Sequence, residues 1–445
     1  MKTARQSSRA GEVDPGFAPI VIPNPVAGER ELYADLVLAL PEGGLVVGCQ
    51  DDNPMQPPTL VRIGPDYQLD TLFGQQGYAS VDLQTAEPSA RNDGHLLSLD
   101  RLADGRLLAR LETHVVLEDE RRITCLALAC FNSDGSKDLG FANGGVRIYP
   151  LPGPELKRPK TLSKLASKIP VPRVVRFPLR SYGDLKLLPD GKLLIVTSVQ
   201  DVTEGTHRAY VLRLTPDGEF DPTFNGNGLM EPKSYMWFKP YRLLPQGNGM
   251  MLIGGEHPGI PFIARFDESG ALDQSFADEG YFTDFGNYAY TSFFKLLPDE
   301  AGNVFFTGQR GGTTFLDGRG VVAVGKFDSQ GQISSDFNGG QTVLIEPNEP
   351  EDVVLYNFDT FIDSSKRVVL AGRKMAPGGA IGYVARLLED GQVDTSVGMD
   401  GVRYFTPEGI RGLTDIFESP ASPEYYYATA LAPDYQPARL YRLLS

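Results

Sequence analysis

The chain has 445 residues, of which 41% are hydrophobic and 10% aromatic, and it contains 49 glycines and 34 prolines. This content is enough for a core, and so many glycines and prolines favour short strands joined by tight turns over long helices. The formal net charge of −15 excludes a general affinity for nucleic acid, because the phosphate backbone is bound by Lys and Arg.

The chain begins with "MKTARQSSRAGEVDPGF", which is basic and polar and lacks the apolar core of a secretory signal peptide. We predict a flexible tail over residues 1–10. No window reaches 18 consecutive apolar residues, so we expect no transmembrane segment. The expected protein is a monomer that is cytoplasmic or exported without a cleaved signal peptide. Its three cysteines, Cys49, Cys125 and Cys130, are an odd number and predict no disulfide framework.

A short motif recurs along the chain, with an acidic residue three positions before an aromatic one. The copies are "GEVDPGF" 11–17, "YQLDTLFGQQG" 67–77, "SKDLGFANGG" 136–145, "GEFDPTFNGNG" 218–228, "GALDQSFADEG" 270–280, "GQISSDFNGG" 331–340 and "GQVDTSVGMDG" 391–401. The shared position is Asp14, Asp70, Asp138, Asp221, Asp273, Ser334 and Asp394, and the residue three later is Phe in all but the last copy, which has Val397. Seven copies in one register indicate a repeat protein.

Each period also contains alternating segments that predict half-buried strands. They precede the motif, as in "VLRL" 211–214, and follow its glycine run, as in "GVRYF" 401–405. Strand–turn–strand units such as "LPDGKLLIV" 188–196 lie between the copies, where Pro and Asp-Gly suit a tight hairpin. About four strands per period are typical of a propeller blade.

The two ends of the chain complement each other. The last segment, "ARLYRLLS" 438–445, is the strand that should precede a motif, whereas the first motif, 11–17, has no strand before it. We therefore predict an all-β fold, a single seven-bladed β-propeller of four-stranded blades over residues 1–445. It is closed by an N-terminal strand that completes the C-terminal blade, which removes the open sheet edge.

These motifs resemble the delta-60 repeat of bacterial proteins, in which a strand is followed by D-G-x-L-D-x-x-F, a glycine run and another strand. The similarity extends over nearly the whole chain. The resemblance implies a β-propeller-like fold and no common activity.

The repeated acidic residue is expected to turn the chain rather than to react. An Asp accepts hydrogen bonds from amides two and three residues on, and Ser334 is expected to do the same. Seven equivalent positions spread around a ring do not converge on one substrate. The aromatic residue three later is expected to pack between neighbouring sheets.

The sequence offers no standard catalytic or metal-binding motif. The four histidines lie outside zinc-ligand spacings, Cys125 and Cys130 point to opposite faces of a predicted strand, and G-x-S-x-G and phosphate-loop motifs are missing. We predict no metal and no cofactor. Carboxylate runs such as 349–354 and 117–122 are interpreted as solvated surface, although a glycosidase pair is not excluded because its separation is unknown.

The mouth of the central channel is the predicted binding site, since propellers carry ligands there. On the strand before each hairpin we align Leu38, Asp100, Lys186, Arg242, Lys295, Thr360 and Asp415, and near its start Tyr33, His95, Tyr182, Trp237, Tyr290 and Tyr356. The candidate ligand-binding residues are Lys186, Arg242, Lys295, Tyr33, Trp237 and Tyr290, for an anionic or sugar-like ligand. The alternative is that these charges pair with Asp100, Asp415 and water.

One segment interrupts the repeat. Residues 151–180 contain eight Lys or Arg and one acidic residue, so the segment carries +7 and the remainder of the chain −22. Leu162, Leu165, Ala166 and Ile169 have the spacing of a short amphipathic helix. The candidate partner-binding residues are Lys157, Arg158, Lys160, Lys164 and Lys168, for an acidic protein. The alternative is an insertion that folds back on the chain's own acidic surface.

Two functions remain open on the sequence. The first is a binding or scaffold module that presents the channel mouth and the basic loop to a partner or a polar small molecule. The second is a hydrolase or lyase acting on a glycan or another polar small molecule at the channel mouth.

Overall fold

The computed structural model describes residues 10–22, 33–50, 56–83, 95–116, 122–142, 144–149, 183–201, 206–234, 238–257, 260–285, 290–311, 320–346, 353–376, 378–398, 400–405, 410–418, 423–430 and 439–445. The predicted tail and the basic segment 151–180 lie outside these residues, apart from Ala10.

The described residues form an all-β structure in which neighbouring strands pair antiparallel. Four four-stranded sheets follow the chain: β2 (Tyr33–Ala39), β3 (Leu45–Gln50), β4 (Thr59–Ile63) and β5 (Tyr78–Ser80); β6 (His95–Arg101), β7 (Leu107–Val116), β8 (Arg122–Phe131) and β9 (Val146–Tyr149); β10 (Gly183–Leu187), β11 (Leu193–Asp201), β12 (Thr206–Leu214) and β13 (Leu229–Met230); β14 (Lys239–Pro245), β15 (Met251–His257), β16 (Ile260–Phe266) and β17 (Tyr281–Phe282). The prediction of four strands per period is confirmed for these sheets.

The next eight strands form one sheet made of two antiparallel groups. The first group is β18 (Tyr290–Pro298), β19 (Val304–Gly311), β20 (Gly320–Phe327) and β21 (Val343–Ile345), and the second is β22 (Val354–Ile362), β23 (Val368–Ala376), β24 (Gly379–Leu387) and β25 (Val402–Tyr404). A single parallel pair, Gly320 with Val354, joins the two groups. Only two helical elements occur in the described residues, the 3-10 turns η1 (Gly247–Gly249) and η2 (Asn338–Gly340).

The remaining sheet is built from both ends of the chain. Its order is β1 (Ile20–Val21), β28 (Arg439–Leu444), β27 (Tyr425–Ala430) and β26 (Leu413–Glu418). Beyond the pairing of β1 with β28, the amide of Gly11 donates to the carbonyl of Leu444 at 2.7 Å and that of Asp14 to the carbonyl of Arg442 at 2.8 Å. These backbone bonds hold residues 10–22 against the C-terminal strand.

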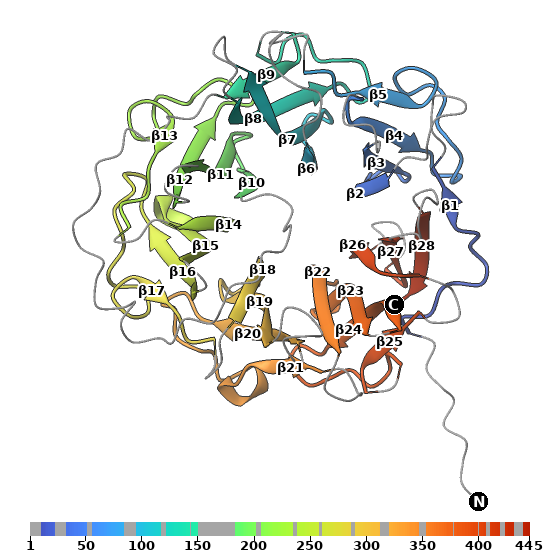
Figure 1. The fold of residues 1–445 in the computed structure, drawn as a ribbon, viewed down its shortest axis with the longest axis vertical. Coiled ribbons are helices and arrows are strands. Elements are labelled where there is room, and N and C mark those ends of the chain that lie inside the picture. The colour runs from blue at the N-terminus through green and yellow to red at the C-terminus, as the bar shows by residue number, and fades with distance from the viewer. Residues whose placement is uncertain are drawn as a thin grey trace, which may run out of the picture.

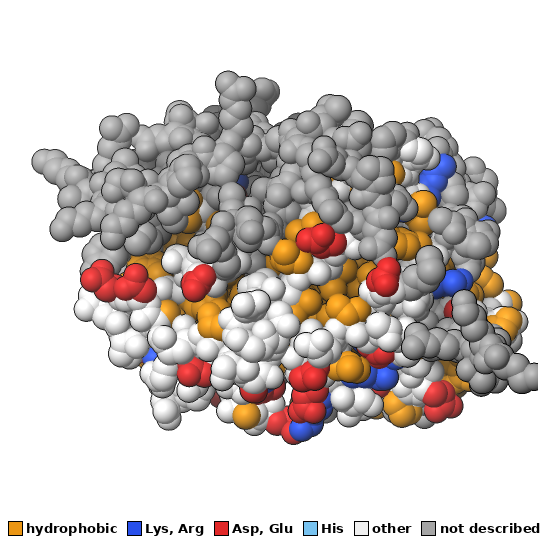
Figure 2. All heavy atoms as spheres, turned by 90° about the horizontal axis from the view of Figure 1, so that it is seen from below, with side chains coloured by type: hydrophobic (Ala, Val, Ile, Leu, Met, Phe, Trp, Pro, Cys, Tyr) orange, Lys and Arg blue, Asp and Glu red, His pale blue; other side chains and the backbone are white. Residues whose placement is uncertain are grey.

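The sheets lie around a common axis in a propeller-like arrangement (Figure 1). The strands nearest the axis are β2, β6, β10, β14, β18, β22 and β26, which we call the inner strands. No helix in the described residues is long and apolar enough to span a membrane. In Figure 2, Asp and Glu side chains are scattered over the visible described surface, as the acidic composition leads us to expect.

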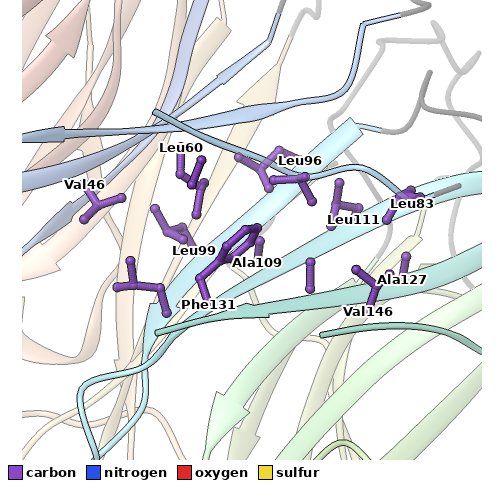
Figure 3. Close-up of a cluster of buried hydrophobic side chains, with 14 of the residues drawn as sticks. Val46, Leu60, Leu83, Leu96, Leu99, Ala109, Leu111, Ala127, Phe131 and Val146 are labelled. Atoms are coloured by element: carbon purple, nitrogen blue, oxygen red, sulfur yellow. The ribbon is translucent and has the colours of Figure 1, made fainter. Parts of the chain in front are cut away.

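The core is divided into clusters that lie between neighbouring sheets. In the cluster of Figure 3, Val46 and Leu60 of the first sheet face Leu99, Ala109 and other residues of β6–β9. The motif aromatics belong to these clusters: Phe73, Phe141, Phe224, Phe276 and Phe337 each pack against the sheet that follows. The predicted packing of these rings between sheets is therefore confirmed, and Phe17 packs against β3 and β4 in the same way.

The repeated carboxylate closes a turn. In each of the six copies that have Asp, its Oδ1 accepts the amide two residues on at 2.9–3.1 Å, as in Asp221 with Thr223. The amide of the aromatic residue, or of Val397 in the last copy, also donates to the carbonyl of this Asp. The carboxylate thus shapes the chain, as predicted.

The second carboxylate oxygen meets a basic residue that the sequence analysis overlooked. An Arg eight residues earlier, on the preceding strand, donates through Nε to the Asp: 2.8 Å for Arg213 and Asp221, 2.7 Å for Arg265 and Asp273, and 2.7 Å for Arg386 and Asp394. The guanidinium of Arg213 also lies 4.8 Å from the ring centre of Phe224. We call this combination the Arg–Asp–Phe unit. It could have been recognised from the Arg in "VLRL", "IARF" and "VARL".

Two copies build the unit differently. Where the third copy has Cys130 at the Arg position, Arg106 of the preceding hairpin donates to Asp138 at 2.6 Å. In the sixth copy the expected capping by Ser334 is wrong: its hydroxyl donates to Asp336, and Lys326 pairs with Asp336 at 2.9 Å. A serine cannot balance the cation at that position, so the carboxylate two residues on takes its place.

Candidate functional site

The inner strands share a register shift that sets which side chains are equivalent. It falls directly before Leu36, Ser98, Arg242, Lys295, Asp359 and Asp415. The backbone amide that closes the following hairpin belongs to the residue four positions after the shift, in every inner strand for which that amide is described. Counting back four residues from the closing amide of the β10 hairpin identifies Asp184 as the equivalent residue on β10. The equivalent set is therefore one hydrophobic residue, one serine, three aspartates and two cations.

This set corrects the alignment made from the sequence. Arg242 and Lys295 stand at the shared register position, whereas Lys186 and Asp100 each lie two residues beyond it on their own strands. Thr360 lies one residue beyond Asp359, which stands at that position. Each position aligned in the sequence lies two residues before the start of an LPDG-like turn. In β14 and β18, however, the closing amide belongs to the residue after the proline, and in β10 to the leucine itself.

The three aspartates each reach the next inner strand. Oδ2 of Asp184 accepts the amide of Leu243 at 3.1 Å, and Oδ2 of Asp359 accepts the amide of Ile416 at 3.1 Å. Oδ2 of Asp415 accepts the amide of Val37 at 3.0 Å, which connects β26 to β2 and so the last sheet to the first. These carboxylates stabilise the contacts between successive sheets near the axis.

Cations gather around Asp184. Lys186 Nζ lies 3.0 Å from its Oδ2, and Arg242 and Arg110 are its other basic neighbours. Burial opposes ionisation of Asp184, but Lys186, Arg242 and Arg110 outweigh it, so its pKa lies below the ordinary value. Lys186 and Arg242 are half-buried, whereas Arg110 is only 3% exposed. Three cations thus face one aspartate, and burial raises the pKa of the neighbouring Asp100, which favours the uncharged form of that carboxyl.

Arg110 is incompletely satisfied. Its Nη2 donates to the carbonyl of Gly183 at 3.3 Å, while Nε and Nη1 have no hydrogen-bond partner among the described residues. Among the described strands, no other sheet has a charged residue paired at this register position, so Arg110 of β7 is an exception. The residues there are Gly48, Val196, Gly254, Thr307, Ala371 and Thr429. A buried guanidinium with free donors is a suitable group for holding an anion.

A second charged group lies on β18, β22 and β26. Lys295 Nζ is 2.7 Å from Asp359 Oδ1, and Asp359 also neighbours Asp415. Burial and the charge of Asp359 raise the pKa of Asp415 well above its ordinary value. Burial also opposes ionisation of Asp359, but Lys295 outweighs it and the pKa of Asp359 is lowered. The pKa values of the two carboxyl groups are therefore displaced in opposite directions.

Exchanging the two carboxyl groups for amides should have unequal effects. Asp415→Asn keeps an acceptor for the amide of Val37 and, like the protonated carboxyl that the raised pKa favours, carries no charge, so we expect the free energy of unfolding at neutral pH to change by less than about 1 kcal/mol. Asp359→Asn removes the counter-charge of Lys295, and we expect a loss of about 2 kcal/mol, because this lysine is partly hydrated. Urea unfolding of both variants measures the difference.

The pH dependence gives a second measurement on the same variants. Because the folded-state pKa of Asp415 is raised, the folded protein binds this proton more tightly than the unfolded chain does. The contribution of Asp415 to stability should decline as pH rises from about 4 through its folded pKa, and Asp415→Asn should lack this decline. Equal pH profiles for wild type and Asp415→Asn would contradict the assignment.

The structure brings together only part of the predicted ligand site. Lys186 and Arg242 share Asp184 as a neighbour, and Lys295 pairs with Asp359 rather than with Asp415. Tyr33 and Tyr290 begin the inner strands β2 and β18, but their side chains lie outside the described part. Trp237 and the basic residues Lys157, Arg158, Lys160, Lys164 and Lys168 also lie outside it.

Arg110, Asp184 and Asp359 were not among the residues predicted from the sequence. Asp184 and Asp359 could have been found by counting four residues back from each hairpin. Arg110 had no comparable signal, because only the pairing of β6 with β7 places it beside the inner strand. Within the described ranges, no group of three His, Cys, Asp or Glu is placed to hold a metal ion.

Comparison with known proteins supports the architecture. Residues 123–141 and 188–224 match the family described as domain of unknown function DUF5122, a beta-propeller. The match falls on the second and third sheets and includes the motifs of Asp138 and Asp221. No curated protein matches the chain. This family description concerns the fold and contains no activity.

Solved structures with a similar arrangement share little sequence with this chain. A protein of unknown function from Dyadobacter fermentans is 9% identical, with a TM-score of 0.44, over 97% of this chain and 100% of its own. The Penicillium chrysogenum alpha-L-arabinanase complexed with arabinobiose is 10% identical, with a TM-score of 0.39, over 80% of this chain and 94% of its own. Prolyl oligopeptidase B from Galerina marginata is 10% identical, with a TM-score of 0.45, over 94% of this chain and 51% of its own.

Proposed function

We propose that this chain is a seven-bladed β-propeller closed by its own N-terminal strand, and that it works as a binding module with an anion site at the inner strands. Two contacts between the chain ends support closure: the pairing of β1 with β28 and the bond from Val37 to Asp415. The repeat number, and the single parallel pair joining β18–β21 to β22–β25, support seven units.

The observation that carries the anion site is the group of cations around Asp184. Arg110, Lys186 and Arg242 come from three successive sheets, and Lys295 follows on the next inner strand. The nearby carboxylates are engaged by backbone amides and lysines, which favours a positioning role for them over a catalytic one. The ligand we propose is a small polar anion or an acidic segment of a protein, and the charge of +7 on segment 151–180 would attract such a partner.

One feature favours the alternative, a hydrolase or lyase. The pKa of Asp359 is lowered and that of Asp415 is raised, and two carboxyl groups of unequal pKa can supply a general base and a general acid. Their engagement with the amides of Ile416 and Val37 restricts both groups in this role.

Titration calorimetry with inorganic phosphate, citrate and a hexaglutamate peptide tests the binding module. We expect Arg242→Ala and Arg110→Met each to weaken binding by about tenfold or more, since a lost charge-assisted hydrogen bond is worth roughly 1.5–3 kcal/mol. Lys366→Gln is the control, because Lys366 is exposed and only loosely paired with Glu300 and Glu389 on the outer surface. Deleting residues 151–180 should weaken the binding of the hexaglutamate peptide more than the binding of phosphate.

Two outcomes would contradict the proposal. The first is that none of the three anions binds, and the second is that Arg242→Ala and Arg110→Met bind as the wild type does. Turnover of a glycoside that is lost in both Asp359→Asn and Asp415→Asn would favour the hydrolase.

A further inference from the structure

A cavity of about 270 Å³ lies where the first and last sheets meet. It is lined by residues 39–45 of the β2–β3 turn and by Pro65 and Tyr67 of the first sheet. The last sheet contributes Phe417, Tyr425, Tyr427 and Arg442. We call it the seam cavity. It is formed by different residues from those of the inner-strand cations.

Tyr67 is the exception in its repeat position. Three residues before the shared Asp or Ser, the other six copies have glycine, all with positive φ: Gly11, Gly135, Gly218, Gly270, Gly331 and Gly391. Tyr67 adopts the same left-handed backbone, with a φ of 63°, which a tyrosine rarely does. A strained side chain at one position of a repeat, beside a cavity, points to a role that the repeat alone does not require.

The aromatic side chains form a wall with hydroxyl groups. The ring of Tyr67 packs edge-on against Phe17 at 4.9 Å, and its hydroxyl lies 2.5 Å from that of Tyr427. Tyr427 stacks on Phe417 at 5.8 Å with an interplanar angle of 27°. Burial and the bond to Tyr67 raise the pKa of Tyr427 to about 12, so its hydroxyl stays protonated at neutral pH and can hydrogen bond.

The charges at the seam cavity are already balanced. Arg442 donates to Asp14 Oδ2 through Nε at 2.8 Å, pairs with it through Nη2 at 2.5 Å, and lies 4.4 Å from the ring centre of Tyr425. Glu42 faces Arg62 at 3.7 Å and Arg101 at 3.6 Å. Because each charge at the cavity has a counter-charge, the cavity favours a neutral ligand over an ion.

The volume of the seam cavity and its aromatic side chains indicate which kind of neutral ligand would fit. A cavity of about 270 Å³ is at the small end of ligand sites, which suits a single ring. Flat aromatic faces stack on the C–H face of a sugar ring, and tyrosine hydroxyls with a carboxylate satisfy its hydroxyl groups.

We propose that the seam cavity binds one neutral sugar ring, as a free monosaccharide or as the end of a glycan, with Tyr67 as its principal contact. The ring lies against the aromatic wall, and the hydroxyls of Tyr67 and Tyr427 and the carboxylate of Glu42 hydrogen bond to it. This site is separate from the proposed anion site, so either can fail without the other.

Saturation-transfer NMR followed by titration calorimetry tests the site on the full chain. The probes are the neutral sugars glucose, galactose, mannose, xylose and arabinose, with glucuronate and glucose 6-phosphate as charged comparisons. We expect at least one neutral sugar to bind more tightly than both charged sugars. Tyr67→Gly should weaken it by about tenfold or more, and Tyr67→Phe, which keeps the ring and loses the hydroxyl, by about three- to tenfold.

Melting temperatures of the same variants separate binding from folding. Tyr67→Gly installs the residue that the other six copies have and relieves the left-handed tyrosine, so it should melt within a few degrees of the wild type. Leu72→Ala is the control, since Leu72 is 88% exposed and does not line the cavity. The proposal is overturned if no neutral sugar binds, if the charged sugars bind more tightly, or if Tyr67→Gly binds as the wild type does.

Discussion

Removal of residues 1–22 is expected to leave a chain that does not fold to a stable monomer. The deletion strips β28 of one of its two partner strands, leaves Arg442 without Asp14, and takes Phe17 and Ile22 out of the core between the last and first sheets. Losing one buried side chain of this size costs about 2–5 kcal/mol, and total stability is about 5–15 kcal/mol. We therefore expect a loss of more than about 5 kcal/mol and insoluble protein.

A peptide added in trans distinguishes a missing strand from general damage. A synthetic peptide of residues 10–22, added during refolding of the truncated chain, should restore soluble protein, because it can pair with β28 as an added strand. A scrambled peptide of the same composition should not. Size-exclusion chromatography and far-UV circular dichroism report both results. A truncated chain that is soluble and as stable as the wild type would contradict the role of these residues.

Replacing a buried arginine of the repeat is expected to have the second largest effect. Arg386 is 2% exposed. Its guanidinium donates hydrogen bonds to Asp394 at 2.7 Å, to the hydroxyl of Ser396 at 3.0 Å and to the hydroxyl of Tyr426 at 3.0 Å. Arg386→Ala leaves a buried carboxylate without its counter-charge, so we expect the free energy of unfolding to fall by about 3–5 kcal/mol. Urea titration followed by fluorescence measures it.

The equivalent arginine of another copy is the matched control. Arg62 has a more exposed side chain and lies 3.3 Å from Asp70, so Arg62→Ala should cost no more than about 1 kcal/mol. A similar loss in both variants would show that burial does not set the strength of the unit.

The dependence of the free energy of unfolding on pH below neutrality tests the pairing of Asp394 with Arg386. Burial opposes ionisation of Asp394, but Ser396 and Arg386 outweigh it, so its pKa is lowered in the folded state. Its contribution to stability is present above about pH 4 and declines as pH falls toward the folded pKa. In Arg386→Ala this decline should be shallower than in the wild type.

Much of the fold could be predicted because the same short-range pattern, a turn-forming residue followed by a core aromatic, recurs in the sequence. Asp221 and Phe224 have fixed partners within a few residues, so their roles as turn and core follow from spacing alone. The Arg partner was missed although it stands at a constant distance from the Asp. Cys130 and Lys326 replace that Arg in two copies. In the first a cation from the preceding hairpin binds the Asp, and in the second a carboxylate two residues after the shared position binds the Lys, and no local rule predicts which.

The candidate sites were harder to predict because they depend on register and on contacts between sheets. The hairpins close at different distances from the leucine of each turn, so Asp184 and not Lys186 is equivalent to Arg242. Arg110 lies on a second strand and approaches Asp184 only through sheet packing. Tyr67 was visible as a departure from glycine, but the cavity it lines joins residues more than 300 positions apart, as its bond to Tyr427 shows.

The central claim is that the two ends of the chain belong to one sheet, and an engineered disulfide tests it most directly. Val13 and Leu443 are bridged antiparallel neighbours, so cysteines at both positions should form an intramolecular disulfide on mild oxidation. The native cysteines are buried and should not compete. We expect a monomer with faster non-reducing migration and a melting temperature that is higher in the oxidised than in the reduced form of the variant. Failure to oxidise, or covalent dimers alone, would contradict the claim.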